Sequence, residues 1–399
     1  MQFRWIWLLG TCFCGADQQG KCMDKSITVL GQEYLKQENS RFKIPTPALI
    51  LDLDALEDNI HRMSSRAKEK GIHLRPHCKS HKSVNVAQLQ MKAGALGVSC
   101  ATIGEAEVMA RGGISGILIT SPIVSPGKIV RLIALHEQAS DILIVVDNVR
   151  NIEDLAKANS QSQTPIRVLI DFDIGQNRTG VKSIEEALAL ADLILANPTL
   201  QLVGFQAYGG HFQHIANYQD RLKAVRCQNE KIKELRDQLQ KMTPLPLIIT
   251  GGGTGTSDID LKEGVYTEVQ VGSYLFMDVE YSDVELQPEG GSPFKPSLFV
   301  LTTVISSHPN KTIVDAGLKS FATDGPKPRV FSGTSSHFSY EFRGDEHGQV
   351  LSQDPLPIGH VLEFLTPHCD PTVNLYDYYH CVRGNTLVDI WPIEARGLH

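Results

Sequence analysis

Residues 141–175, DILIVVDNVRNIEDLAKANSQSQTPIRVLIDFDIG, carry the pattern that decides the fold. An apolar run, Asp141–Asp147, is followed by an amphipathic stretch and then by a second apolar run, Ile166–Gly175. Short apolar runs separated by a helical stretch are typical of parallel strands joined by a crossover helix. The stretch therefore predicts one βαβ unit of an α/β protein.

The same alternation extends in both directions along the chain. Further apolar runs, separated by amphipathic stretches, cover Ala48–Asp54, His73–His77, Ala95–Ala101, Gly116–Pro122, Leu202–Gly210, Leu245–Gly253 and Thr267–Asp278. Together these runs predict a parallel sheet, and a closed (β/α)₈ barrel needs eight strands. There is one run more than a barrel needs, so either one run lies outside the barrel or the sheet is open.

The pattern changes after Gln287. A Gly- and Pro-rich stretch, PEGGSPFKPS, is followed by short, alternating runs rich in β-branched residues. Such runs predict a second, mainly antiparallel β domain. We expect the barrel over residues 46–285 and the β domain over residues 26–45 and 286–399, because 399 residues exceed the usual size of one core.

Composition and charge narrow the function classes. The chain is 42% hydrophobic and 21% charged, with a net charge of −7 and no long basic run, so it is an ordinary globular protein without a nucleic-acid footprint. Residues 1–25 contain Arg4 and an apolar run from Trp5 to Cys14 that resembles a short export signal but is too short to span a membrane. Eight cysteines without a repeated C-x-x-C pair fit a reducing interior. We expect a cytoplasmic protein with no membrane span, with export through residues 1–25 as the alternative.

The active site of a parallel barrel lies at the carboxyl ends of its strands, so the residues after each run are candidates. Lys79 follows His73–His77 within PHCKSHK. A lysine in a partly dry pocket can lose its proton and form a Schiff base, whereas a solvated basic loop is the structural alternative.

Two other strand ends carry polar groups. Arg178 follows Ile166–Gly175, and Tyr208, His211 and His214 follow Leu202 at the next strand. On spacing alone, an ordinary surface or structural role explains these residues equally well.

Two further motifs carry stronger signals. Gly252, Gly253 and Thr254 lie in GGGTGT directly after an apolar run, where backbone N–H groups can cradle a phosphate. His368 and Asp370 lie two residues apart between prolines in PHCDP. In an extended segment these two side chains point the same way and can share a metal ion, while Cys369 faces elsewhere.

The order and content of these motifs resemble the D-threonine aldolase and D-serine dehydratase group of fold-type III pyridoxal-phosphate enzymes, which share the alanine-racemase barrel. The resemblance runs from Ile44 to the carboxyl terminus. Its motifs are IPTP leading into LILDLDALEDNI, then RPHCKSHKS, DIGQNRTGV, QAYGGH, GGGTGT, VGSYLFMD and PHCDPTVNL. It implies that the first run packs with the β domain and that the barrel begins at His73–His77.

The resemblance also implies roles for single residues. Lys79 matches the lysine that holds pyridoxal phosphate, and the phosphate cradle matches Gly252, Gly253 and Thr254. The expected neighbours of the cofactor ring and phosphate are Arg178, Tyr208 and Tyr274. The divalent-metal pair matches His368 and Asp370, and the proton acceptor is expected to be His211 or His214.

The metal motif discriminates within the group. D-Serine dehydratases carry His-x-Cys, which suits Zn²⁺, whereas D-threonine aldolases carry His-x-Asp, which suits Mn²⁺ or Mg²⁺. This chain has Asp370 at the deciding position, but Cys369 stands one residue earlier, so a register ambiguity keeps the dehydratase interpretation open.

The sequence therefore predicts a lyase, a homodimer by resemblance, that cleaves D-threonine or related 3-hydroxy-D-amino acids to glycine and an aldehyde. A 3-hydroxy-D-amino acid dehydratase is the alternative. A racemase is less favoured because no motif supplies a second base. A non-catalytic pyridoxal-phosphate-binding protein is less favoured because such proteins lack the β domain and the metal pair.

Overall fold

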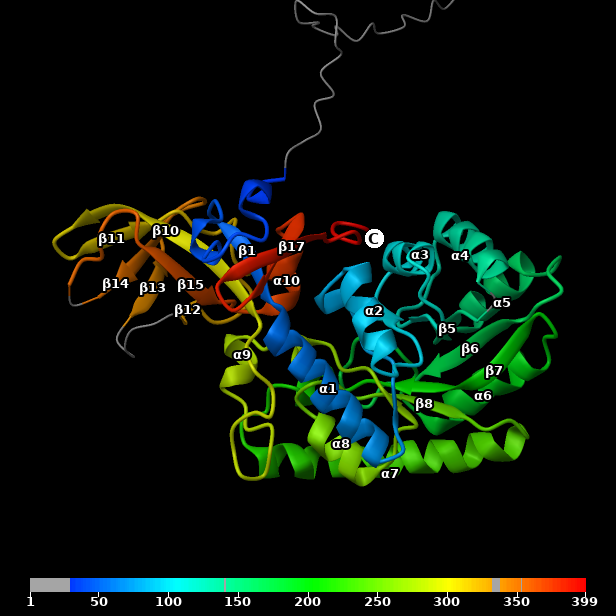
Figure 1. Ribbon diagram of the computed structural model, residues 1–399. Coiled ribbons are helices and arrows are strands. Elements are labelled where there is room, and N and C mark those ends of the chain that lie inside the picture. Colours follow the sequence, from blue (N-terminus) through cyan, green and yellow to red (C-terminus); the bar gives the residue numbers. More distant parts are fainter. Residues whose placement is uncertain (1–28, 140, 332–337, 353) are drawn as a thin grey trace, which may run out of the picture.

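The computed structural model describes residues 29–139, 141–331, 338–352 and 354–399. The expected leader, residues 1–25, lies outside the described residues. Two sheets organise the chain, a barrel wrapped by helices and a smaller β domain beside it (Figure 1).

Eight parallel strands form the barrel, as expected. They are β2 (His73–Leu74), β3 (Ser99–Cys100), β4 (Leu118–Ile119), β5 (Leu143–Val146), β6 (Ile166–Asp171), β7 (Leu200–Ala207), β8 (Ile248–Gly251) and β9 (Glu268–Val269). The order is β2-β9-β8-β7-β6-β5-β4-β3, and a parallel bridge between His77 and Ser99 joins the two ends. All four residues of β5 are buried, because side chains fill the barrel on one face and helices cover the other.

Helices follow most barrel strands. They are α2 (Val84–Lys92), α3 (Ile103–Arg111), α4 (Pro126–Gln138), α5 (Val149–Ala158), α6 (Ile184–Leu195), α7 (Tyr218–Met242) and α8 (Ser257–Glu263), with α1 (Leu53–Glu69) before β2 and α9 (Val279–Ser282) after β9. The short 3₁₀ turns are η1 (Gln32–Tyr34), η2 (Arg41–Lys43), η3 (Cys78–Ser80), η4 (Gly210–Phe212) and η5 (Ser273–Leu275).

Helix α5 illustrates how the sequence sets the start of a helix and its buried face. The Asn148 side chain accepts a hydrogen bond from the Arg150 amide and caps the helix, while Ile152, Leu155 and Ala156 are buried on one face.

The second sheet is mainly antiparallel. It contains β1 (Ala48–Asp52), β10 (Leu298–His308), β11 (Lys311–Val314), β12 (Arg329–Val330), β13 (Ser339–Phe342), β14 (Gly348–Leu351), β15 (Val361–Leu365), β16 (Tyr378–Arg383) and β17 (Thr386–Pro392). β1 pairs antiparallel with β10 and parallel with β16, so the first apolar run lies in this sheet and the barrel begins at β2.

The division at residue 46 therefore needs correction. Residues 48–52 belong to the second sheet, and the chain passes to the barrel at α1, which the Asp52 side chain caps. β1 alternates its contacts: Leu49 and Leu51 join the core shared with the barrel, while Ile50 packs with Phe299 and Leu301 on the other face.

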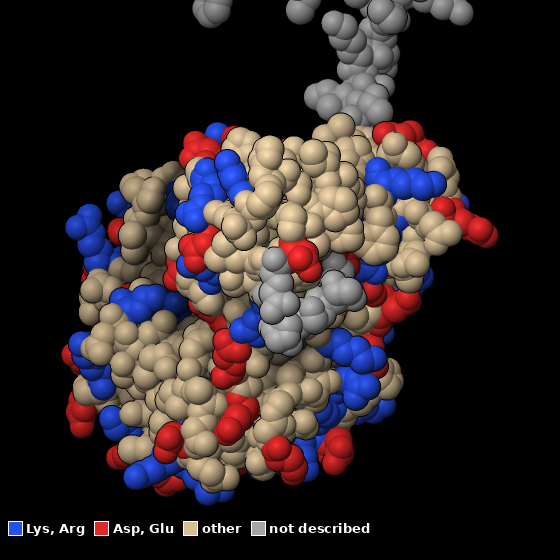
Figure 2. All heavy atoms as spheres, turned by 90° about the vertical axis from the view of Figure 1, so that its left-hand side faces the viewer, with Lys and Arg blue, Asp and Glu red and all other residues tan. Residues whose placement is uncertain are grey.

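Acidic and basic side chains are interspersed over the face drawn in Figure 2, with both signs side by side. Within the described ranges, no helix combines the length and the apolar character that a membrane span requires.

Candidate active site

Lys79 lies on the 3₁₀ turn η3 at the carboxyl end of β2. His77 caps this turn, because its Nδ1 accepts a hydrogen bond from the Lys79 amide at 3.4 Å and its Nε2 lies 3.1 Å from Thr120 Oγ1 on the neighbouring β4 end. Burial, followed by the charge of Lys79, holds the pKa of His77 well below its usual value. His77 is therefore a neutral support for the turn.

The Lys79 ammonium meets Asp370 of the β domain. Lys79 Nζ donates a hydrogen bond to Asp370 Oδ2, and 42% of the lysine side chain is exposed against 12% of the aspartate. Burial opposes the charge on both groups and is the largest single effect on each, but the nearby charges and hydrogen bonds together outweigh it, so the pKa of Lys79 is raised, chiefly by Asp370, and the pKa of Asp370 is lowered, chiefly by Lys79. One of the predicted metal ligands thus lies directly at the predicted cofactor lysine.

The segment that carries the metal pair is not extended, which corrects the geometry expected from sequence. His368 precedes the short helix α10 (Cys369–Val373), and Asp370 lies in its first turn. Pro371 is compatible with this helix start because amides of a first turn have no helical acceptor. His368 and Asp370 nevertheless lie within electrostatic range of each other, and the charge of Asp370 raises the pKa of His368 against the opposing effect of burial.

The His368 ring is oriented by a residue that sequence reasoning missed. His368 Nδ1 lies 2.8 Å from Asp324 Oδ2, and Nε2 has no hydrogen-bond partner among the residues that the structure describes. A carboxylate on one ring nitrogen is the usual way to orient a histidine that ligates a metal through the other.

Cys369 is fully buried behind the pair. Its amide donates to Asp278 Oδ2 at 2.9 Å, and its Sγ lies 3.3 Å from Asp370 Oδ1. Burial, with Asp278 and Asp370 nearby, raises the pKa of the Cys369 thiol well above its usual value, whereas burial raises the pKa of Asp278 to about 6. Asp370 therefore carries the negative charge beside His368, while the Cys369 thiol is buried behind it.

The structure separates the two candidate histidines. His214 Nε2 lies 3.8 Å from Glu280 Oε2, and the ring packs on Tyr281 at 4.9 Å, within electrostatic range of His368 and Lys79. His211 instead lies near Asp173 and Gly175, which are two residues of the loop that follows β6. Burial lowers the pKa of both histidines, so both rings are neutral near pH 7.

A cavity of about 180 Å³ opens beside Lys79 at the barrel mouth. Its lining comes from the ends of several strands: His77, Lys79, Ala101, Thr120, Ser121, Arg178, Thr179, Gln206, Tyr208 and Gln270. The Arg178 guanidinium lies 5.4 Å from the centre of the Tyr208 ring. Two glutamines make another part of the lining polar, because Gln270 Nε2 donates to Gln206 Oε1 at 3.1 Å. No sequence motif indicated this pair.

The glycine loop after β8 closes tightly on its neighbours. Gly252 adopts φ +64, and a Cβ added there would lie 2.4 Å from Asp260 Oδ2, so only glycine fits. Gln213 Oε1 accepts the Gly255 amide at 2.8 Å, whereas the Thr254 amide has no hydrogen-bond partner among the described residues. The loop therefore keeps a free backbone donor for an anion.

Tyr274 supports this loop from behind. Its amide donates to Thr254 Oγ1 at 2.9 Å, and its buried hydroxyl contacts Gln90 and not the cavity. The residues present thus fit pyridoxal phosphate: an amine at Lys79, a cavity for a ring, and loops after the seventh and eighth barrel strands for the phosphate.

A metal site would rest on fewer residues than the cofactor site. Nowhere in the described part of the chain do three or more His, Cys, Asp or Glu side chains gather in an arrangement that could hold a metal. His368 and Asp370 fit a hard divalent ion that takes its remaining ligands from water and substrate.

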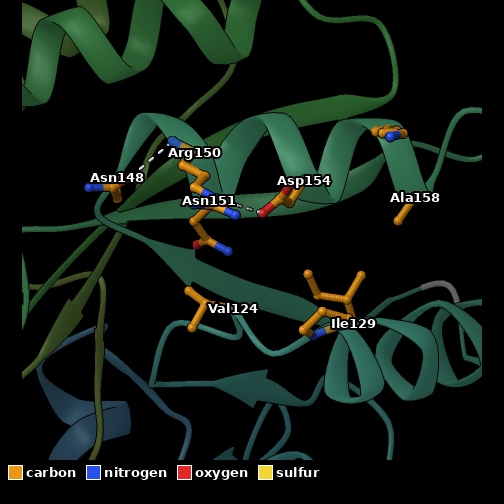
Figure 3. A pocket seen from close by; sticks show the side chains of 9 residues that line it. Val124, Ile129, Asn148, Arg150, Asn151, Asp154 and Ala158 are labelled. Carbon is orange, nitrogen blue, oxygen red and sulfur yellow. Dashed lines mark hydrogen bonds and ion pairs between the residues drawn. The ribbon is translucent and has the colours of Figure 1, made fainter.

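A larger cavity of about 690 Å³ lies away from these residues, between α4 and α5 (Figure 3). Val124 and Ile129 form its apolar side, and on the opposite side Arg150 pairs with Asp154 at 3.7 Å. None of the predicted site residues lines it, so the smaller cavity is the candidate active site.

Comparisons with known proteins identify relatives for both parts of the chain. The family described as "Alanine racemase, N-terminal domain" matches residues 51–280, and "Putative serine dehydratase domain" matches residues 297–382. The 3-hydroxy-D-aspartate aldolase of Paracoccus denitrificans and the D-threonine aldolase of an Arthrobacter species are each 38% identical, over 89% of this chain and 93% of theirs.

A solved structure and a more distant relative complete the comparison. The D-threonine aldolase structure from Filomicrobium marinum superposes with a TM-score of 0.84 and 35% identity, over 89% of this chain and 96% of that one. The D-threo-3-hydroxyaspartate dehydratase of a Delftia species shares 25% identity over 89% of this chain and 98% of its own.

Proposed function

Because the chain belongs to the alanine racemase N-terminal domain family, we propose that it is a pyridoxal-phosphate- and divalent-metal-dependent aldolase for 3-hydroxy-D-amino acids. It is an enzyme of the carbon–carbon lyase class, as its aldolase relatives are. The observation that carries the proposal is the meeting of Lys79, from the barrel, with Asp370, from the β domain.

Cofactor binding uses groups from the whole barrel mouth. Lys79 would hold pyridoxal phosphate, Gly252, Gly253 and Thr254 would receive its phosphate, and Arg178 and Tyr208 would contact its ring. When bound, this cofactor withdraws the electron pair released at Cα. Lys79 is suited to its task because its amine faces the cavity while the rest of its turn is buried and hydrogen-bonded.

Metal binding would use His368, oriented by Asp324, and Asp370, with Mn²⁺ or Mg²⁺ as the expected ion. When bound, such an ion lowers the pKa of a hydroxyl that it contacts. Cys369 is buried and protonated, which supports Asp370 as second ligand and the aldolase over the dehydratase with its Zn²⁺.

Cleavage of the Cα–Cβ bond turns the β-hydroxyl into a carbonyl, so the hydroxyl proton needs an acceptor. His214 is the proposed acceptor, because its ring is neutral near pH 7 and lies on the side of the site that His368 and Glu280 form. D-Threonine would yield glycine and acetaldehyde.

The decisive experiment incubates the enzyme, with pyridoxal phosphate and Mn²⁺, with D-threonine and separately with D-serine. Glycine and acetaldehyde from D-threonine support the aldolase; 2-oxo acid and ammonia as main products overturn it in favour of the dehydratase. L-Threonine should be inert, because one fixed metal and one lysine hold a single Cα configuration in productive geometry.

We also propose a homodimer in the cytoplasm. Cys78, Cys100, Cys369 and Cys381 are buried free thiols, and Cys78 and Cys100 approach to 3.4 Å between sulfurs without a bond, which suits a reducing compartment. Light scattering of the purified enzyme measures its mass, and a monomer at micromolar concentration contradicts the dimer.

A further inference from the structure

A chain of buried polar side chains connects the turn that carries Lys79 to the loop proposed for the phosphate. It runs from His81 through Gln90 and Tyr274 to Thr254, and none of these residues is more than 2% exposed. Polar groups so deeply buried are costly unless they are hydrogen-bonded. Their placement between the two ends of one cofactor site therefore calls for a functional explanation.

His81, two residues after Lys79, presents one hydrogen-bond donor to this chain. Its Nδ1 accepts the Ser83 amide at 3.1 Å, so the ring proton lies on Nε2. Its backbone carbonyl accepts the Tyr379 hydroxyl at 2.7 Å, which fixes the residue. Burial lowers the pKa of His81 to about 3, so the ring stays neutral.

Gln90, on α2, links His81 to Tyr274. Its Nε2 donates to the Tyr274 hydroxyl at 3.1 Å. Gln90 Oε1 and His81 Nε2 are both buried, and neither atom has a hydrogen-bond partner among the described residues. The Gln90 side chain is nevertheless close enough to raise the pKa of His81 against the effect of burial, so an unpaired acceptor and an unpaired donor lie near each other.

Tyr274 connects Gln90 to the loop proposed for the phosphate. Its amide donates to Thr254 Oγ1, and its ring packs edge-on against Phe294, with centres 5.6 Å apart. Tyr274 therefore contacts Gln90 through its hydroxyl and Thr254 through its backbone amide.

We propose that His81 and Gln90 are positioning residues that set the separation between the Lys79 amine and the phosphate loop, and thereby the affinity for pyridoxal phosphate. The inference rests on the proposed function, in which Lys79 and Thr254 bind opposite ends of that cofactor. A rigid ligand held at both ends binds best when the two ends of its site are already at the right spacing.

The test is the dissociation constant of pyridoxal phosphate, measured by titrating the apoenzyme and following the absorbance of bound cofactor. Gln90→Leu removes the acceptor that lies near the His81 donor and the amide that donates to the Tyr274 hydroxyl, so the constant should rise by about tenfold or more. Tyr274→Phe removes one oxygen and should raise it by roughly threefold, and the double variant should show less than the product of both effects.

Two further variants separate positioning from general stability. Gln90→Glu keeps the acceptor near His81 and replaces the Nε2 donor with an acceptor to which the Tyr274 hydroxyl can itself donate, so it should restore affinity to within about threefold of wild type. Asn159→Leu removes a similarly buried amide, which donates to Thr164 O and Thr199 O at the other end of the barrel. It should lower the melting temperature and leave the dissociation constant unchanged.

The outcomes distinguish a failure of the inference from a failure of the proposed function. Gln90→Leu and Tyr274→Phe variants that bind the cofactor as tightly as wild type overturn the inference and leave the proposed function intact. A wild-type apoenzyme that binds no pyridoxal phosphate overturns the proposed function itself. If Gln90→Leu does not fold, Tyr274→Phe alone decides.

Discussion

Lys79 and Lys82 lie three residues apart, and their surroundings differ. Lys79 Nζ faces the cavity and Asp370, whereas Lys82 is 9% exposed and its Nζ lies 2.5 Å from Glu105 Oε1. Lys79→Ala should therefore abolish both turnover and the adduct that borohydride traps, detected by mass spectrometry of the reduced protein. Lys82→Met is the matched control and should keep the adduct; an adduct lost only in the Lys82 variant moves the Schiff base to that residue.

Asp324 offers a sharper test of the metal site than the ligands themselves, because it touches only the far side of the His368 ring. Asp324→Asn should weaken Mn²⁺ binding by about 10–100-fold, as measured by the Mn²⁺ concentration that restores activity after EDTA treatment. His368→Ala and Asp370→Ala should not recover at all. Asp345→Asn, on the exposed loop paired with Lys319, should behave as wild type. Activity that survives complete chelation contradicts the metal role.

Single residues show how far sequence reasoning reached. The spacing of His368 and Asp370 suggested a metal pair, but nothing in the sequence connects them with Asp324, 44 residues from His368. His211 and His214 could not be told apart either. Only the fold shows that His211, on η4, lies near Asp173, whereas His214, just after η4, lies near Glu280. Local spacing encodes ligands on one segment, whereas contacts between segments depend on the packing of the whole chain.

At the scale of elements, helix α8 starts with a buried carboxyl whose protonation couples to stability. Burial raises the pKa of Asp260 from 3.8 to about 7, while Thr256 Oγ1 donates to it at 2.6 Å. The folded state therefore binds the proton more tightly than the unfolded state. The stability contributed by this proton is present below about pH 4 and is lost as pH rises toward 7.

Asp260→Asn should remove that loss. The wild type loses stability between pH 5 and pH 8, and the variant does not. The free energy of unfolding of the variant minus that of the wild type should therefore become about 3 kcal/mol more positive over this range, because each pH unit below the folded pKa contributes about 1.4 kcal/mol. Urea unfolding at both pH values measures this difference. Asp192→Asn, exposed on α6, controls for the loss of a carboxylate. A difference that does not change with pH contradicts the prediction.

Elements were predictable where their pattern was local. The runs located every barrel strand, although β2, β3 and β4 are each only two residues long, because the barrel ladder pairs just part of each run. The runs did not reveal β12, β13 or β16, and they suggested an extended segment where α10 begins. β1 shows the other limit: its apolar pattern equals that of a barrel strand, and only its pairing with β10 and β16 assigns it to the second sheet.

At the scale of the molecule, the proposed site lies where the two domains meet. The β domain would supply His368 and Asp370, and the barrel would supply Lys79 and the glycine loop after β8. Besides the hydrogen bond from Lys79 to Asp370, three hydrogen bonds join the residues just after the Lys79 turn to the β domain: Tyr379 hydroxyl to His81 O at 2.7 Å, Ala395 amide to Lys82 O at 3.0 Å, and Val84 amide to Glu394 Oε2 at 3.1 Å. The segment that carries Lys79 is therefore held by both domains.

The chain path strengthens this coupling. The second sheet takes β1 from before the barrel and β10 to β17 from after it, so the whole barrel is inserted between two parts of this sheet. Asn59, on α1, donates to Leu275 O at 2.9 Å and to Lys295 O at 2.7 Å, which ties the crossing helix to the segment that returns to the β domain. Loss of one sheet removes partners from the other.

We therefore expect the protein to unfold as one cooperative unit, and not domain by domain. Differential scanning calorimetry should give a single transition whose calorimetric and van't Hoff enthalpies agree. Tyr379→Phe removes only the hydroxyl that binds His81 O, so it should lower the stability of the whole molecule by about 1 kcal/mol and keep the single transition. Tyr378→Phe, at the exposed neighbouring position, is the matched control and should change little. Two resolved transitions in the wild type contradict this view if one of them disappears when residues 298–399 are deleted. Such a result means that the barrel holds the Lys79 turn without the β domain.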